Sequence, residues 1–378
     1  MTKPLEGVLV ADFSRVLAGP LATATLADLG ATVIKVERPG RGDDTRQWGP
    51  PWTDNSTSYF DCANRSKKSI ELDLADEADL VVARRLASRA DVLVENFLPG
   101  SLDRKGLGYD ELIQLNPGLV YCSITGFGSI GGAELPGYDF LVQAVGGLMS
   151  ITGDPSSDPA KVGVALVDVL TSKDAVIGIL AALKARETTS RGDRVEVNLL
   201  SSLLGSLANQ ASSYLATGTA PTRMGNRHPS IAPYETLRCK DGLLAVACGN
   251  DAQFARLAEA VGDPDLAADA RFATNGTRVE NRQALVARLE EGLRDEVVDR
   301  WVEILTAVKV PAGKVGSIAS AFELAASLGL EPLVSVGPEA APQVRHPITY
   351  RNARLSDYRP PPRLGEHNDD IRAWLEED

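Results

Sequence analysis

The stretch GVLVADFSRVLAGPLATATLADLGATVIKVE, residues 7–37, contains the pattern that decides the fold. The apolar run at 7–13 predicts a strand, and residues 19–31 predict a helix that opens at Gly19-Pro20, since proline is favoured in the first turn of a helix. The run TVIKVE, residues 32–37, predicts a second strand. A strand, a helix and a strand in this order form a βαβ unit.

The alternation of strands and helices continues along the chain. Further strands are expected at 69–74, 91–97, 119–127 and 194–200, and further helices at 76–90, 109–117, 138–150, 169–186 and 201–217. This order predicts an α/β fold with a Rossmann-like large domain, in which helices flank a parallel sheet.

The composition changes near residue 217, where GTAPTRMGNRHPSIAPY indicates a linker. We expect residues 1–216 to form the first part of the large domain and 217–330 to form a smaller α+β domain with its linkers. Within the latter, 234–248 predicts two strands joined at Asp241-Gly242, and amphipathic helices are expected at 251–262 and 282–307. Residues 331–378 are loop-rich.

Charge and composition exclude several classes of protein. The chain has 39 basic and 51 acidic residues among 378, and the net charge of −12 opposes binding to nucleic acid. No apolar run is long enough to span a bilayer, and the N-terminus lacks the pattern of a signal peptide, so we expect no membrane segment and a cytoplasmic location. Four separated cysteines and three separated histidines signal no metal site and no disulfide framework. The chemistry is therefore expected to rest on carboxylates.

The segment GFGSIG, residues 126–131, matches the dinucleotide pattern G-x-G-x-x-G and follows a predicted strand. That fingerprint requires a helix to begin directly after it, so that the helix N-terminus faces the pyrophosphate. Here GAELPG, with Pro136 and Gly137, intervenes, and the motif follows the fourth or fifth strand rather than the first. We therefore interpret it as a glycine-rich turn rather than an NAD site.

Basic residues follow several predicted strands. By topology the ends of these strands share one rim of the sheet, where α/β folds bind ligands. The residues are Arg15, Arg38, Arg41, Arg104 and Lys105. They suit a phosphate-rich ligand. Solvated surface side chains are the alternative that the residues by themselves leave open.

Two acids, Asp139 in PGYDFLVQAVGG and Asp168 in VALVDVLTS, lie near the starts of apolar helices. Either carboxylate could cap its helix, or either could carry chemistry. Asp168 follows four apolar residues, and the desolvation of a charge at such a position is costly unless the group is paired or used.

At these residues the sequence resembles the class III CoA-transferases, a family that includes formyl-CoA transferase, carnitine CoA-transferase and the α-methylacyl-CoA racemases. The resemblance covers essentially the whole chain. Segments that carry it include DFSRVLAGPLATATLADLGATVIKVERPGRGDDTR, YFDCANRSKKSIELDL, DVLVENFLPGSLDRKGLGY, GYDFLVQAVGGLMSITG, the VDVLTS turn, MGNRHPSIAPYETLRCKDG and LGEHNDDI.

The resemblance implies that Asp168 is the nucleophile. A carboxylate there would open an acyl-CoA thioester to a mixed anhydride, and the reaction would continue through an aspartyl-CoA thioester. Asp139 is assigned a supporting catalytic role. Gly225 and Asn226, in a loop that covers the site in relatives, are candidates for shielding it or for donating hydrogen bonds to the oxyanion.

The same correspondence predicts the groove for CoA, in which Phe97 would pack on adenine and arginines would meet the phosphates. The predicted residues are Arg15, Val16, Ala18, Arg38, Leu72, Asn96, Phe97 and Arg104. Some relatives carry lysines where this chain has Ala75 and Gly137, so part of the phosphate clamp differs.

Racemase members are the main alternative. They use acids at the positions of Asp139, Asp168 and Asp251, with a histidine directly before the first. Here that position is Tyr138, and an ordinary tyrosine titrates near pKa 10, so a two-base proton transfer loses one partner. Transfer is therefore favoured over epimerisation, and Asp251 receives only a secondary role at the substrate.

The resemblance further implies an interlocked homodimer in which residues 331–378 return to the large domain. Substrates would be an acyl-CoA and a carboxylic acid, such as the small dicarboxylate succinate, with no metal or redox cofactor. A non-catalytic acyl-CoA binding protein of the same fold is the third alternative.

Overall fold

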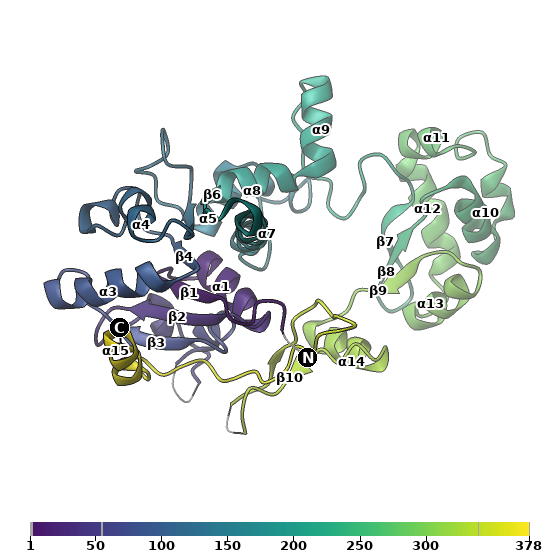
Figure 1. Ribbon diagram of the computed structural model, residues 1–378. Coiled ribbons are helices and arrows are strands. Elements are labelled where there is room, and N and C mark those ends of the chain that lie inside the picture. The colour runs from purple at the N-terminus through teal and green to yellow at the C-terminus, as the bar shows by residue number, and fades with distance from the viewer. Residues whose placement is uncertain (1–2, 54–55, 339, 378) are drawn as a thin grey trace. The chain divides into compact units, whose positions relative to one another are not determined.

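The computed structural model describes residues 3–53, 56–338 and 340–377 and groups the chain into two units (Figure 1). The first unit contains Met1–Leu148, Lys161–Thr219 and Glu331–Asp378, and the second contains Met149–Ala160 and Ala220–Leu330. The sequence-based division differs in two segments. Residues 217–219 group with the first unit, and residues 149–160 group with the second unit rather than with the large domain. Their backbone is linked to that unit by the bond from the Gly225 amide to the Gly153 carbonyl, at 2.9 Å.

A parallel six-stranded sheet forms the centre of the first unit. Its order is β3-β2-β1-β4-β5-β6, and every neighbouring pair is parallel. The strands are β1 (Leu9–Asp12), β2 (Thr32–Glu37), β3 (Lys68–Glu71), β4 (Val92–Glu95), β5 (Val120–Thr125) and β6 (Arg194–Asn198). This is the strand order of the Rossmann fold, and the direction of winding reverses between β1 and β4. The predicted α/β class with a parallel sheet is confirmed.

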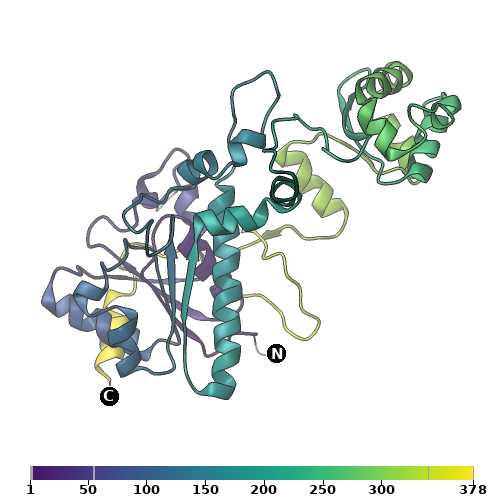
Figure 2. The same ribbon diagram turned by 90° about the horizontal axis from the view of Figure 1, so that it is seen from above.

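Apolar residues alternate between the two faces of the sheet, so each face packs against its own helices. Val10 and Val33 point to the face covered by α1 (Ala18–Asp28), α5 (Asp139–Val145), α7 (Leu166–Thr189) and α8 (Leu199–Ser206). Ala11 and Ile34 point to the face covered by α3 (Glu77–Arg89), α4 (Tyr109–Leu115) and α15 (Asn368–Glu376). Both views show α15, the end of the described chain, beside α3 (Figures 1 and 2).

Two helices expected in the first unit are each two helices in the structure. The segment 138–150 divides between α5 and α6 (Leu148–Ile151). The segment 201–217 divides between α8 and α9 (Ala208–Thr217), because Ala208 has a φ of +45° and interrupts the helical backbone. The shorter elements are η1 (Asp44–Gln47), α2 (Ser58–Asp61), η2 (Asp103–Lys105), α6 (Leu148–Ile151), β10 (Leu333–Val334) and β11 (Gln343–Val344).

The second unit contains an antiparallel sheet with the order β7-β8-β9, formed by Tyr234–Arg238, Leu243–Ala247 and Ala312–Lys314. Its helices are α10 (Asp251–Ala260), η3 (Pro264–Ala267), α11 (Asn275–Glu280), α12 (Arg282–Leu293), α13 (Val298–Ala307) and α14 (Ile318–Ser327). The single helix expected at 282–307 is therefore α12 and α13. The side chain of Asp241 accepts the Val298 amide at 2.8 Å, which satisfies a free donor where α13 begins. None of the helices in the described residues has the length and apolar content that a bilayer crossing requires.

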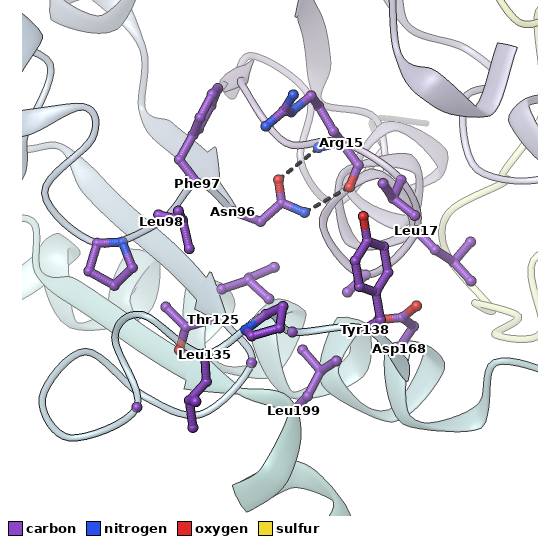
Figure 3. A pocket seen from close by; sticks show the side chains of 18 of the residues that line it. Arg15, Leu17, Asn96, Phe97, Leu98, Thr125, Leu135, Tyr138, Asp168 and Leu199 are labelled. Atoms are coloured by element: carbon purple, nitrogen blue, oxygen red, sulfur yellow. Dashed lines mark hydrogen bonds between the residues drawn. The ribbon is translucent and has the colours of Figure 1, made fainter. Parts of the chain in front are cut away.

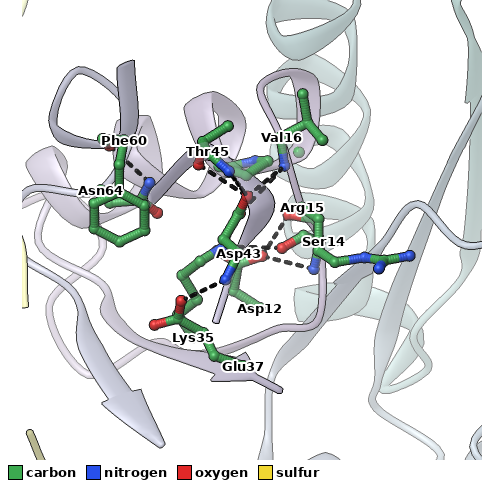
Figure 4. Close-up of polar contacts among 12 residues, drawn as sticks. Asp12, Ser14, Arg15, Val16, Lys35, Glu37, Asp43, Thr45, Phe60 and Asn64 are labelled. Carbon is green, nitrogen blue, oxygen red and sulfur yellow. Dashed lines mark hydrogen bonds and ion pairs between the residues drawn. The ribbon is translucent and has the colours of Figure 1, made fainter. Parts of the chain in front are cut away.

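Buried charges connect the carboxyl end of β1 with Lys35 of β2 and with Lys67, which precedes β3 (Figure 4). The Asp12 carboxylate, fully buried at the end of β1, accepts from the Lys67 ammonium at 3.0 Å and from the Thr23 hydroxyl at 2.6 Å. Burial by itself raises the pKa of Asp12, but the charges of Lys67 and Lys35 outweigh it and hold the pKa at about 2. Asp12 is therefore ionised in the folded protein, and its charge is balanced inside the core.

The second part of this network fixes the loop after β1. The Lys35 ammonium lies 2.9 Å from the Asp43 carboxylate and donates to the Ser14 carbonyl, also at 2.9 Å. Asp43 in turn accepts the Val16 amide at 3.2 Å (Figure 4). Charges from two strands thus determine the path of residues 13–17.

Replacing Lys67 with methionine tests this network. The variant leaves the buried Asp12 carboxylate without its nearest cation, and loss of one partner of a buried ion pair costs about 3–5 kcal/mol. We expect the midpoint of urea unfolding, at fixed protein concentration, to fall accordingly. Lys68→Met, at the adjacent and less buried position, is the control and should lower the midpoint far less. Equal effects of the two variants would contradict the role given to the network.

Candidate active site

A cavity of about 350 Å³ lies at the carboxyl ends of β1, β4 and β5 (Figure 3). Its walls are residues 15–18 after β1, residues 96–99 after β4, and 124–126 with 132, 133 and 135–138 at and after β5. Asp44, Asp168 and Leu199 complete the lining. The position is the switch point between β1 and β4, where open α/β sheets bind their ligands.

Arg15 and Asn96 join the two loops at this switch point. The Arg15 amide donates to the Asn96 side-chain oxygen at 2.8 Å, and the Asn96 side-chain nitrogen donates to the Arg15 carbonyl at 2.7 Å (Figure 3). The Arg15 guanidinium lies 4.8 Å from the centre of the Phe97 ring, a cation–π distance. A cation and an aromatic face are therefore held together on one wall of the cavity.

Two neighbours hold this wall in place. The Glu95 carboxylate accepts the Phe97 amide at 2.8 Å, which fixes the turn that follows β4. Val16 has a φ of +70°, a conformation that is costly for a β-branched residue, and its amide is bound by Asp43. The strained residue thus lies where the buried network meets the cavity.

The glycine-rich stretch after β5 forms a loop whose two ends touch. A Cβ atom added to Gly137 would lie 2.5 Å from the Cα of Gly126, so neither position has room for a side chain. The next helix after Gly131, α5, begins only at Asp139. The loop therefore lacks the helix N-terminus of a dinucleotide site, in agreement with its interpretation as a turn.

Asp168 lies in the first turn of α7, and its side chain lines the cavity (Figure 3). Burial, and then the negative charge of Asp139, raise the pKa of Asp168 to about 7. A carboxylate that is partly desolvated and has a like charge beside it is destabilised as an anion, which makes it a stronger nucleophile at neutral pH than an ordinary aspartate.

Neither acid caps the helix in which it lies, since α5 and α7 both begin without a side-chain cap. Asp139, at the start of α5, instead binds the first turn of α7. One of its oxygens accepts the amides of Val167 and Asp168, at 2.7 and 3.3 Å, and the other accepts the Gln143 side-chain nitrogen at 2.7 Å. The Asp168 carboxylate has no hydrogen-bond partner among the residues that the structure describes. Of the two acids, Asp139 therefore holds the helix, and Asp168 is left open to the cavity.

The amides in the first turn of α7 are all occupied. Leu166 and Val169 donate to the carbonyls of Val164 and Ala165, while Val167 and Asp168 donate to Asp139. An oxyanion that forms at Asp168 must therefore receive hydrogen bonds from outside this turn.

Sequence reasoning missed several residues around Asp168. The Tyr59 phenol, on α2, is close enough that burial, and then the charge of Asp168, raise its pKa to about 12. Thr125 and Leu199 line the cavity from β5 and α8. Tyr59 lies within YFDCANRSKKS, a segment that carried the family resemblance, but nothing in its local pattern indicated a role.

The residues predicted for the groove fall into two groups. Those that line the cavity are Arg15, Val16, Ala18, Asn96 and Phe97, together with Tyr138 of the substrate group. Arg38 and Arg104 are exposed beyond β2 and β4, outside the lining. Leu72 also lies outside it, because its side chain is buried among the core residues that face α3 and its amide donates to the Glu37 carbonyl.

The remaining predicted residues belong to the second unit. Gly225 has a φ of +64°, and the Asn226 side chain donates to the Thr236 hydroxyl at 3.1 Å. Asp251 begins α10 and forms an ion pair of 2.6 Å with Arg278, which is fully buried. This pairing gives Asp251 a structural contact within its own unit.

Comparison with known proteins identifies the family. The model of CoA-transferase family III matches residues 5–368. The chain therefore belongs to this family and is a CoA-transferase, an enzyme that moves CoA from an acyl-CoA donor to a carboxylic acid.

Among its relatives is a succinate–glutarate CoA-transferase of Agrobacterium fabrum, 42% identical over 99% of this chain and 96% of that protein. A succinyl-CoA:glutarate CoA-transferase of Mus musculus is 40% identical over 97% of this chain and 85% of that protein. A crystal structure of a CaiB/BaiF family protein from Brucella suis is similar in fold, with a TM-score of 0.89 and 45% identity over 100% of both chains.

Substitution of Asn96 with aspartate tests the junction at the cavity. The new carboxylate cannot donate to the Arg15 carbonyl and repels it, so the loop that carries Arg15 should shift. We expect CoA to bind about tenfold more weakly, equivalent to roughly 1.4 kcal/mol, by isothermal titration calorimetry.

Asn116→Asp is the matched control. The Asn116 side chain also donates to a backbone carbonyl, that of Ala90 at 2.8 Å, but before the amino ends of β4 and β5. This variant should lose similar stability and keep its affinity for CoA. If both variants bind CoA equally well, the junction does not shape the site.

Proposed function

We propose that this enzyme transfers CoA between small dicarboxylic acids through a covalent intermediate on Asp168. The observation that carries this proposal is the carboxylate of Asp168, which faces the cavity with a pKa raised to about 7 and with no partner among the described residues. In the first turn of a helix the anion also benefits from the helix dipole, so it is available near neutral pH.

In the first half of the reaction, an oxygen of Asp168 attacks the thioester carbon of the acyl-CoA. The carbon–sulfur bond breaks, CoA leaves as its thiolate, and a mixed anhydride remains on Asp168. The thiolate then attacks the Asp168 carbonyl carbon, which releases the donor acid as a carboxylate and leaves an aspartyl-CoA thioester.

The second half runs the same chemistry in reverse order with the acceptor. A carboxylate oxygen of the acceptor attacks the aspartyl thioester, expels the CoA thiolate and forms a second anhydride. The thiolate attacks the acceptor carbon, and Asp168 leaves as a carboxylate. Every step exchanges one acyl bond for another, so the scheme uses CoA and acyl-CoA as substrates and requires no metal or redox cofactor.

The lining of the cavity supports a CoA-binding side and a reactive side. Phe97 and Arg15 form one wall and suit the adenine and phosphates of CoA, while Asp168 and Tyr138 lie together on another side (Figure 3). Arg38 and Arg104, exposed beyond neighbouring strands, remain candidates for the phosphates outside the cavity. Gly225 and Asn226 remain candidates for the oxyanion, since the first turn of α7 has no free amide.

The dicarboxylate class rests on the relatives, whose names include transfer between succinate and glutarate and, for a protein of Acetobacter aceti 41% identical to this chain, transfer from acetyl-CoA to oxalate. A nearby cation would bind the distal carboxylate of such an acid.

An acceptor panel tests the substrate class. With succinyl-CoA as donor, we expect glutarate and other short dicarboxylates to yield new thioesters at rates at least about tenfold above butyrate and other monocarboxylates, measured by mass spectrometry of the CoA products. Faster transfer to monocarboxylates would overturn the dicarboxylate assignment. Binding of acyl-CoA without any exchange would instead favour a non-catalytic binding protein.

Asp168→Asn and Asp168→Ala test the nucleophile. Each removes the attacking oxygen, so turnover should fall by at least about 1000-fold while CoA still binds. Asp174→Asn, an acid on the same helix, is the control and should retain activity. Quenching the wild-type reaction and digesting it should place the acyl or CoA modification on the peptide that contains Asp168. A modification elsewhere, or an active Asp168→Ala, would contradict the mechanism.

Racemisation gains no support from these contacts. A two-base mechanism needs two groups that are free to move protons at the α-carbon. Both oxygens of Asp139 already accept hydrogen bonds from α7 and Gln143, and Asp251 is paired with Arg278.

We further propose that the enzyme is a homodimer with interlocked subunits, as the family resemblance implies. Large apolar side chains are exposed on α9 and α14, among them Tyr214, Leu215, Ile318 and Leu324. Such surfaces are typical of subunit interfaces. The cytoplasmic location stays a prediction.

A further inference from the structure

The amide of Gln143, on α5, is completely buried and uses both of its ends. Its nitrogen donates to the Asp139 carboxylate at 2.7 Å and lies 3.4 Å from the Val164 carbonyl. Its oxygen accepts the Val162 amide at 2.9 Å. The carboxylate requires a donor and the Val162 amide requires an acceptor, so only one orientation of the side-chain amide satisfies both.

These bonds connect Gln143 to the segment that leads into α7. The Asp139 oxygen that does not contact Gln143 accepts the amides of Val167 and Asp168. Gln143 thus holds the carboxylate that binds the first turn of α7, and it also ties down Val162 and Val164 just before that turn. The Asp168 backbone is therefore held by Asp139 at its own amide and by Gln143 through the segment that precedes it.

We propose that Gln143 is a positioning residue for the transfer reaction: it holds Asp139 against the first turn of α7 and thereby fixes the direction in which the Asp168 carboxylate enters the cavity. Gln143 acts through Asp139, without contact with the substrate. This inference rests on the proposed function, since it assigns a role relative to the nucleophile Asp168.

The inference has a physical reason. The attacking oxygen must approach the thioester carbon to about 3–3.5 Å, and a displacement of about 1 Å can cost about 100-fold in rate. Asp168 has no side-chain partner in the described residues that could orient its carboxylate directly. Its position therefore depends on the backbone of the first turn, which Asp139 and Gln143 hold.

Gln143→Leu removes the amide and keeps most of the volume. We expect kcat to fall by about 100-fold at every pH while KM for the acyl-CoA stays unchanged, because the groove does not involve this residue. Asn116→Leu, which also removes an amide that joins two backbone segments, is the matched control. It should lower the melting temperature without this loss of kcat.

Gln143→Glu supplies a readout that a purely structural role would not move. The titratable groups around this bond are Asp139, Asp168 on α7 and the Tyr59 phenol on α2. Two carboxyls in contact share a proton. While the Q143E carboxyl holds that proton, its O–H can donate to Asp139 and its other oxygen can accept the Val162 amide.

The wild-type kcat should rise through about pH 7, because the raised pKa of Asp168 leaves its reactive anion depleted below that pH and fully formed above it. We expect Q143E to follow this rise and then to lose activity at alkaline pH, where the shared proton leaves and the two carboxylates repel. Q143E should thus recover at neutral pH a large part of the kcat that Q143L loses.

Three outcomes would overturn the inference. They are a Q143L enzyme with wild-type kcat, a Q143E profile without the alkaline fall, or losses of kcat that only parallel losses of melting temperature. The failure of the proposed function is a separate result, because it requires turnover by Asp168→Asn or Asp168→Ala. An inactive Asp168→Ala together with a fully active Q143L would reject the positioning role of Gln143 and leave the proposed function standing.

Discussion

The charge of Asp12, buried at the end of β1, is the constraint on which the rest of the site depends. An isolated carboxylate in this place would be strongly destabilising. Asp12 is instead surrounded by Lys67, Lys35 and two hydroxyl donors, Thr23 on α1 and Ser14 in the loop after β1. The same Lys35 holds Asp43, and Asp43 holds the Val16 amide. The cation that neutralises Asp12 in the core, Lys35, therefore also holds the loop that follows β1 in place.

The topology then determines where that loop is useful. In the order β3-β2-β1-β4-β5-β6, the connections after β1 and β4 diverge to opposite faces and leave a crevice at the carboxyl ends of these strands. The Asn96 side chain bridges the crevice by hydrogen bonds to the Arg15 backbone, and this leaves the guanidinium free to lie over Phe97. The positive φ of Val16 is tolerated because Asp43 binds its amide and Asn96 binds the backbone of the preceding residue, Arg15.

At the other side of the cavity, Asp139 and Asp168 differ in their hydrogen bonds. Asp139 is saturated by donors and serves as a fixed negative charge at the start of α7. That charge, added to burial, raises the pKa of Asp168 to about 7. Two residues of the same chemical type thus differ in their surroundings, because amide groups bind both oxygens of Asp139 while the Asp168 carboxylate faces the cavity.

The sequence by itself determined the class of fold and the family, because hydrophobic periodicity and ordered motifs are local properties of the chain. It also selected Asp139 and Asp168, but it could not show which of them binds the first turn of α7. That depends on the backbone amides of α7 and on Gln143, which packing brings together. It could not identify Tyr59, or separate Leu72 from the cavity lining, since alternation along a strand does not say which buried face borders a ligand. Only the tertiary structure decided these points, because desolvation, hydrogen-bond partners and the neighbouring charge are set by residues far apart in the chain.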